Sequence, residues 1–319
     1  MNWIAPLARF RVDFAKIPAF HWQMAFSTAV ILGVLFIGNA LTSVHVQSLG
    51  GTSIAVTLLT AGILPLPLYW HEKGKNKLRD AALAVPWAMV FATILPFPVA
   101  VAARLGMGMS LRDNSFAWLD QSIGVSVPGV MAWASNHWLG ELASTSYVFL
   151  IPMIPICFLL PALTGKVKHA QQFLTANLIA FALGLSLFTL LPAVGPWYGY
   201  HLSATPDQAS CQLSQLVLRT PGPYVFHLNG VVCFPSFHVI WAILCARAVW
   251  CFWPLRIPVS VLSGLIVLST MTTGWHYFVD VLAGAIVASL SIVGAKLLYH
   301  LSTPMGTGPT DDFGERWPI

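Results

Sequence analysis

Three residues have side chains that are unusual for their apolar surroundings: His238, His276 and Asp280. Of the 11 Asp and Glu residues in this chain of 319, Asp280 is the only one well inside a long apolar run. A carboxylate facing hydrocarbon is costly, so it indicates a functional site with a partner nearby. His276 lies four residues earlier, and residues four apart share one face of a helix. A structural His–Asp pair that ties two helices together would have the same spacing.

The second stretch is Phe-Pro-Ser-Phe-His, residues 234–238. Pro235 suits the first position of a helix, because the N–H that proline lacks is not needed there. Ser236 and His238 then fall in its first turn. Residues 272–274, Thr-Thr-Gly, precede the run that contains His276 and can cap a helix starting there. Two converging helix N-termini would form an anion site.

A phosphoester fits this arrangement. Asp280 would hold one nitrogen of His276, so that the other can attack phosphorus and form a phosphohistidine. His238 would protonate the leaving alkoxide and later activate the acceptor. We therefore predict His276 as the nucleophile and His238 as the general acid and base.

The composition is that of a membrane protein that crosses the bilayer several times. Charged residues make up 8% of the chain, against about 25% in soluble domains. Hydrophobic residues make up 57%, in blocks near the roughly 20 residues that span a bilayer. The class predicted is all-α, with about eight spans: 22–44, 53–70, 81–103, 142–163, 173–191, from 235 onward, 258–272 and 276–299.

Three predicted regions follow from these spans. Residues 1–80 would form an arm and two extra helices, 81–300 a six-helix catalytic core, and 301–319 a disordered tail. Residues 105–141 suit an interfacial segment, and 192–233 a long polar loop. With the N-terminus inside, 12 of the 16 basic residues fall inside and three outside, as the positive-inside rule requires. Both histidines then lie outside, which is periplasmic for a bacterial inner membrane and luminal in a eukaryote, with both termini cytoplasmic.

The two stretches resemble the second and third signatures of the type-2 phosphatidic acid phosphatase superfamily. The matching residues are Pro235, Ser236, His238, His276, Tyr277, Asp280 and Gly284. The resemblance extends over about 81–299. It implies a six-helix core that performs its chemistry at the outer membrane face.

The chain departs from that pattern in its cations. Phe237 stands where the family has Gly, Thr270 stands where it has Arg, and the Lys-x6-Arg-Pro signature is absent. With Gly-Pro-Trp-Tyr at 195–198, the chain is more similar to the inositol phosphorylceramide synthase branch. That branch moves a phospho-alcohol head group between lipids, and a diester carries one negative charge instead of two.

Five further residues are predicted to bind substrate: Ser236, Arg219, Tyr277, Trp197 and Tyr198. Arg219 is the only cation in the 192–233 loop and could reach the phosphate, and a solvated loop arginine is an equally good interpretation. The aromatic residues could shape the head-group pocket, but interfacial aromatic belts are common. His201 and His227 suit surface packing.

No metal or other cofactor is predicted, including the vanadate of haloperoxidase relatives. Asp280 could join the histidines as a metal ligand, yet its spacing suits orientation of His276 better. Cys211 and Cys233 could form a disulfide in an oxidising compartment, and the sequence leaves this open.

The favoured function is a lipid phosphotransferase whose partners are a phospholipid donor, an acceptor lipid and the bilayer, without nucleic acid. A lipid phosphatase that uses water is the runner-up. A proton-coupled transporter would explain His276 and Asp280, but not the Pro-Ser-x-His helix start on the same side.

Overall fold

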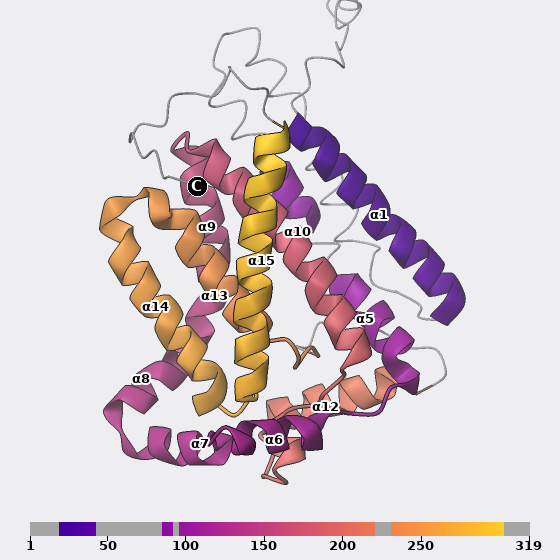
Figure 1. The fold of residues 1–319 in the computed structure, drawn as a ribbon, viewed down its shortest axis with the longest axis vertical. Coiled ribbons are helices and arrows are strands. Elements are labelled where there is room, and N and C mark those ends of the chain that lie inside the picture. Colours follow the sequence, from indigo (N-terminus) through magenta and orange to yellow (C-terminus); the bar gives the residue numbers. More distant parts are fainter. Residues whose placement is uncertain (1–18, 43–84, 92–95, 221–230, 303–319) are drawn as a thin grey trace, which may run out of the picture.

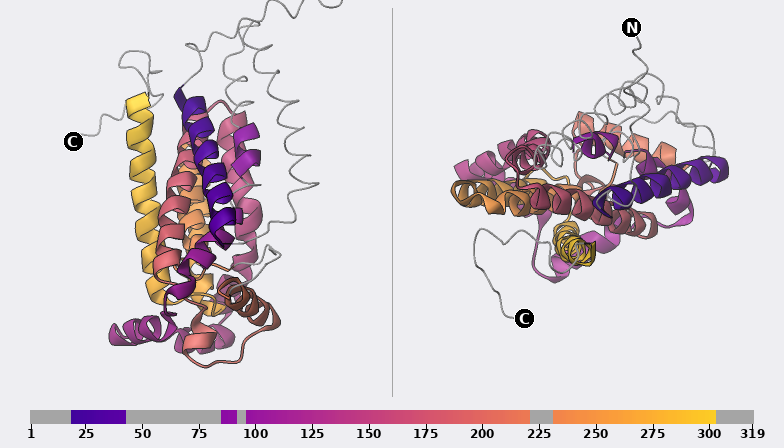
Figure 2. Two further views of the ribbon diagram at one scale, coloured as in Figure 1. Left: turned by 90° about the vertical axis from the view of Figure 1, so that its right-hand side faces the viewer. Right: turned by 90° about the horizontal axis from the view of Figure 1, so that it is seen from above.

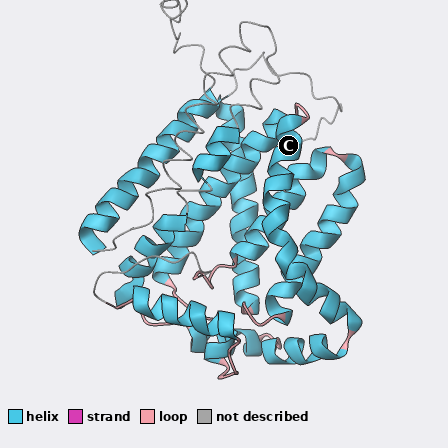
Figure 3. Cartoon of the chain, turned by 180° about the vertical axis from the view of Figure 1, so that it is seen from behind, coloured by secondary structure: helices cyan, strands magenta, loops and turns pink. Residues whose placement is uncertain are grey.

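A computed structural model describes residues 19–42, 85–91, 96–220 and 231–302. These residues form helices and loops without any strand (Figure 3). The elements are α1 (Ala19–Thr42), α5 (Pro96–Leu105), η3 (Gly106–Gly108), α6 (Asp113–Ser122), α7 (Val127–Asn136), α8 (Trp138–Ser146), η4 (Tyr147–Phe149), α9 (Leu150–Leu163), α10 (Val167–Leu190), α11 (Pro196–Gly199), α12 (Pro206–Leu218), α13 (Phe237–Ala248), η5 (Val249–Cys251), α14 (Trp253–Thr272) and α15 (Phe278–Ser302).

Four of the described helical segments are long and apolar enough to cross a membrane: Trp138–Leu163, Val167–Leu190, Trp253–Thr272 and Phe278–Leu301. Shorter apolar helices cover Trp22–Gly38, Phe97–Gly108 and Phe237–Cys251. The predicted all-α membrane class is therefore confirmed. The predicted span 53–70, and with it the boundary of the core at residue 80, lies outside the described residues, as does the tail from 303.

The bundle is organised around α13, which packs against α9, α10, α14 and α15 (Figures 1 and 2). Its buried side chains include the small residues Ala242, Cys245 and Ala248, which let neighbouring helices approach it closely. Gly284 of α15 faces the start of α13, where an added Cβ would lie 2.7 Å from the carbonyl oxygen of Ser236. This close approach fixes the start of α15 beside the start of α13.

Helices α6, α7 and α12 lie across one end of the bundle, below the starts of α13 and α15 (Figure 1). The segment 105–141 is thus helical and lies outside the bundle, consistent with the interfacial segment predicted. The predicted 192–233 loop was wrong in part, because it contains α11 and the 13-residue α12. Thr205 and Gln208 form a capping box at the start of α12, a pattern readable in the sequence.

Candidate active site

The start of α13 places His238. Ser236 is the N-cap of this helix, and its Oγ accepts a hydrogen bond from the backbone N–H of Val239 at 3.4 Å. The helix begins at Phe237, so the prediction that Pro235 occupies the first helical position was wrong. The Ser236 hydroxyl accepts a hydrogen bond from an N–H of the first turn, which a proline side chain cannot do. Ser236 is therefore the N-cap, and the helix starts two residues after Pro235. His238 lies in the first turn, as predicted.

His276 lies in the connection between α14 and α15, two residues before α15 begins. Gly274 turns this connection with a left-handed φ of 72°, and the His276 N–H donates to the carbonyl of Thr270 at 3.0 Å. The prediction that His276 and Asp280 share a helical face was therefore wrong. The turn at Gly274 brings the two side chains together instead.

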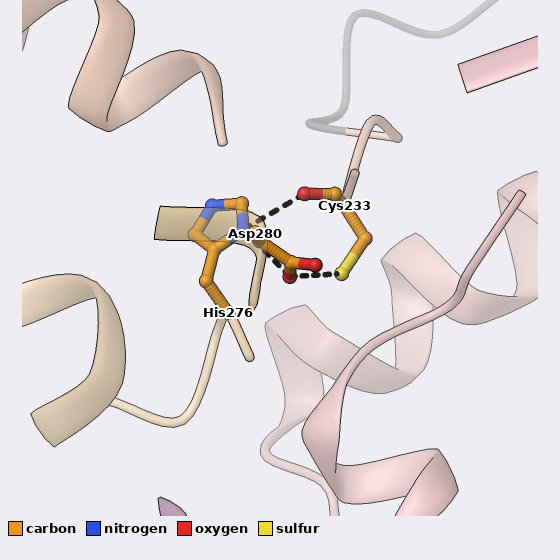
Figure 4. A group of neighbouring side chains, drawn as sticks. All are labelled: Cys233, His276 and Asp280. Atoms are coloured by element: carbon orange, nitrogen blue, oxygen red, sulfur yellow. Dashed lines mark hydrogen bonds and ion pairs between the residues drawn. The ribbon is translucent and has the colours of Figure 1, made fainter. Parts of the chain in front are cut away.

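One nitrogen of the His276 ring is held by two oxygens. Nδ1 lies 2.9 Å from the backbone carbonyl oxygen of Cys233 and 3.4 Å from Oδ2 of Asp280. Both are acceptors, so Nδ1 carries the proton and Nε2 keeps its lone pair. Figure 4 shows the second ring nitrogen turned away from Cys233 and Asp280. The main partner of Nδ1 is thus a carbonyl that the spacing of the signatures did not indicate.

Asp280 is fully buried, and its Oδ2 accepts two hydrogen bonds besides its contact with His276. The Tyr277 N–H donates at 2.9 Å and the Cys233 thiol at 3.1 Å (Figure 4). The other carboxylate oxygen, Oδ1, has no hydrogen-bond partner among the described residues. Cys233 therefore contacts both members of the pair, the carboxylate with its thiol and the imidazole with its carbonyl.

The sequence left open a disulfide between Cys211 and Cys233, and in this structure the two cysteines are not joined by one. Burial, with the nearby charge of Asp280, raises the pKa of the Cys233 thiol well above its usual value. The thiol consequently stays protonated and donates to the carboxylate.

His238 is held by a ring that the sequence did not single out. Tyr147, in η4, stacks on its imidazole with centroids 4.3 Å apart and planes 22° apart. The rings of His238 and His276 lie 5.8 Å apart between centroids. The fold therefore brings the two predicted histidines together.

The first N–H groups of α15 are already bound by a carboxylate of α6. Asp120 accepts hydrogen bonds from Phe278 at 2.8 Å and from Val279 at 3.0 Å. The prediction that this helix start is capped by residues 272–274 and binds an anion was wrong. Its donors are occupied, so of the two helix starts predicted to bind an anion, that of α13 is the one whose first N–H groups have no partner among the described residues.

Asp113, seven residues before Asp120 on α6, binds the loop before α11. Its carboxylate accepts from the N–H groups of Val194 and Gly195, at 2.9 Å each. The Tyr277 hydroxyl lies 2.8 Å from the Gly195 carbonyl oxygen and 3.1 Å from Asp113. Burial raises the pKa of Asp113 and of Asp120, against the opposing effect of these hydrogen bonds. Tyr277, predicted to bind substrate, is fully buried in this network.

The two other aromatic candidates differ in their surroundings. Trp197 is buried, donates from Nε1 to Gln212 at 3.1 Å and packs edge-on against Trp275 at 5.3 Å. It therefore packs against the ring of the residue that precedes His276. Tyr198 is 39% exposed and shows no contact with the histidines.

Arg219 is engaged elsewhere. Its guanidinium donates to the carbonyls of Gly106, at 2.8 Å, and Met109. Arg104 likewise donates to the carbonyl of Thr220. Arg219 thus fastens the end of α12 to the end of α5, and the structure does not bring it to the histidines.

His276 is held as a neutral base. Burial lowers its pKa to about 4, although the hydrogen bond to the Cys233 carbonyl acts in the opposite direction. Above that pH the imidazole is unprotonated, so Nε2 can act as a nucleophile.

Cys233, His276 and Asp280 also offer sulfur, nitrogen and oxygen atoms within 4.8 Å of one another. Each of these atoms already takes part in the hydrogen-bond network around Nδ1. The hydrogen-bond network therefore explains why these atoms lie close together: they orient the ring of His276.

A comparison with models of protein families matches residues 114–294, from α6 to late in α15, to the PAP2 superfamily. The chain belongs to the PAP2 superfamily. Comparisons with curated proteins and with solved structures gave no match.

Membership in the PAP2 superfamily makes the chain an enzyme of the phosphatase or phosphotransferase type. Together with its long apolar helices, it also indicates an integral membrane protein that acts on lipid. The matched range contains both histidines, Asp280 and Asp120, and begins one residue after Asp113.

Sequence reasoning missed Asp113, Asp120, Cys233 and Tyr147 as parts of the site. The seven-residue spacing of the two aspartates places them on one face of a helix, and this could have signalled a shared role. Cys233 and Tyr147 carry no such signal, because only the fold brings them to the histidines.

Proposed function

We propose that this PAP2 enzyme transfers a phospho-head group from a donor lipid to the hydroxyl of an acceptor lipid. The supporting observation is the binding of His276 through Nδ1 alone, which leaves Nε2 with its lone pair near His238. Nε2 attacks phosphorus as the bond to the donor's alcohol oxygen breaks. His238, protonated at the start of the step, gives that oxygen its proton and becomes neutral, and a phosphohistidine remains.

The second half restores the enzyme. His238 takes the proton of the acceptor hydroxyl, whose oxygen bonds to phosphorus while the bond from phosphorus to Nε2 breaks. Asp280 and the Cys233 carbonyl hold the Nδ1 proton and stabilise positive charge on the ring. The backbone N–H groups of Phe237 and His238 have no partner among the described residues. They are suited to receive a phosphoryl oxygen.

A diester substrate suits the few cations available. Of the three arginines predicted on this side, Arg104 and Arg219 donate to main-chain carbonyls. A diester carries one negative charge and needs less compensation than a monoester, which carries nearly two near neutral pH. Arg112, at the N-cap of α6, has a buried Nε without a hydrogen-bond partner among the described residues, and it is the remaining candidate to bind phosphate.

A polar hollow between α7, α8 and the end of α14 suits a head group. It is open to the surface and has a volume of about 720 Å³. Its lining includes His137, Glu141, Ser144 and Thr272, which offer donors and acceptors to a hydroxylated group. The volume lies in the range of about 300–1,000 Å³ typical of small-molecule sites.

The test uses purified full-length protein with a panel of phospholipid donors and lipid alcohols as acceptors, with products resolved by mass. Transfer to a lipid hydroxyl that is lost in His276→Ala and in His238→Ala is the expected result. An acid-labile phosphoprotein should form in the wild type but not in His276→Ala. Release of free phosphate or phospho-alcohol, with acceptor ignored, would instead identify a hydrolase.

A further inference from the structure

A second group of cations lies at the end of the bundle opposite the histidines. Arg247 near the end of α13 and Lys296 near the end of α15 line one recess, together with His169 and Gln172 at the start of α10. Lys296 is 16 residues beyond Asp280 on α15, which is about 24 Å along a helix axis. The recess is therefore separate from the active site.

The lining of this recess contains no carboxylate. The described acidic residues, which are Asp113, Asp120, Glu141, Asp207 and Asp280, all belong to elements at the other end or to the start of α15. Arg247 and Lys296 thus bring two like charges to one place in a setting of low polarity. Such charges repel strongly unless an anion lies between them.

The positive-inside rule alone does not explain this arrangement. It accounts for single cations in loops and at helix ends, but not for the convergence of two of them, Arg247 of α13 and Lys296 of α15, on the same recess. Intramembrane charges of this kind usually face a partner or ligand.

The other lining residues indicate what kind of anion fits. They are apolar side chains from the same three helices: Phe173, Ala176, Leu244, Ala248, Ile292 and Ala295. The cavity holds only about 20 Å³, near the size of one water molecule, so a bulky soluble ligand does not enter it. A phosphate at its mouth, with acyl chains along the apolar helices, satisfies both features.

We propose that Arg247 and Lys296 bind the phosphate of an anionic phospholipid in the membrane leaflet opposite the active site. The long side chains reach the phosphate at the mouth, and Gln172 can donate a further hydrogen bond. Basic pockets between membrane helices bind anionic head groups by the same physics. The site is independent of the reaction proposed above.

The test is native mass spectrometry of the full chain, released from vesicles of equal phosphatidylglycerol and phosphatidylcholine. The wild type should retain phosphatidylglycerol preferentially. The Arg247→Gln/Lys296→Gln variant should lose this preference by about tenfold or more, since each cation near an anionic surface contributes measurably to binding. Arg256→Gln removes a cation at the same end that donates to the Trp250 carbonyl and lies outside the recess, and should change nothing.

Arg247→Lys keeps the charge and should keep the preference, which separates a loss of binding from a loss of folding. Equal retention of both lipids by the wild type, or an undiminished preference in the double variant, would overturn the proposal. Displacement of the lipid by millimolar inorganic phosphate would identify free phosphate as the occupant and overturn the assignment to a lipid. The Arg256→Gln control, assayed in parallel, should have the transfer activity of the wild type.

Discussion

Removal of the Asp120 carboxylate should disable the enzyme although this side chain does not touch either histidine. Asp120 binds the N–H groups of Phe278 and Val279 at 2.8 and 3.0 Å and is fully buried. Hydrogen bonds to a charged group contribute about 1.5–3 kcal/mol each. Asp120→Ala loses both and should destabilise the protein by about 3–6 kcal/mol.

Asp120→Asn keeps one acceptor oxygen and should cost about half of that, roughly 1.5–3 kcal/mol. It should nevertheless reduce activity, because the start of α15 also carries Asp280. A displacement of about 1 Å in a catalytic group can lower the rate about 100-fold. We therefore expect kcat to fall by one to two orders of magnitude in Asp120→Asn.

The assay measures thermal unfolding in detergent and initial rates of lipid turnover on the same preparations. Asp207→Asn is the matched control, since Asp207 is exposed in the first turn of α12 and should leave both quantities unchanged. If Asp120→Ala unfolds and turns over like the wild type, the idea that α6 positions Asp280 is wrong.

Three further predictions concern the same site. Cys233→Ala removes the thiol donor to Asp280 and should lower kcat several-fold, whereas Cys233→Ser, which keeps a donor, should retain most of it; equal rates in the two variants would exclude a role for the thiol. Because burial lowers the pKa of His276 to about 4, kcat/KM should fall through protonation of the nucleophile only as pH falls through about 4, and an acid limb near 6.5 assigned to His276 would contradict the burial of its imidazole. Gly284→Ala places a Cβ against the Ser236 carbonyl and should destabilise the protein by about 1–3 kcal/mol, measured by thermal unfolding; a tolerated alanine would mean that α13 and α15 can separate without loss.

Some predictions from the sequence were wrong for a common reason: a polar group can be satisfied in more than one way. Arg219 was expected at the phosphate because it is the only cation in its segment, but main-chain carbonyls at the end of α5 take its donors. The N-terminus of α15 was expected to bind an anion, but Asp120 occupies it. Sequence identifies such donors and acceptors without showing which of them meet.

The sequence by itself determined the helical membrane class and indicated His238, His276 and Asp280 as the candidate site residues. The membrane class can be read from apolar runs, which are a local property of the sequence. The three residues belong to two short signatures, and each signature lies within one stretch of chain. Even the error over the start of α13 was only two residues.

Only the tertiary structure decided how those residues are held. The Nδ1 atom of His276 binds a carbonyl 43 residues away, and the start of α15 is capped by Asp120 from 158 residues away. Tyr147 reaches His238 from a different helix. These contacts depend on how the helices pack, because side chains far apart in sequence meet only when the buried faces of α6, α13 and α15 have fixed their relative positions.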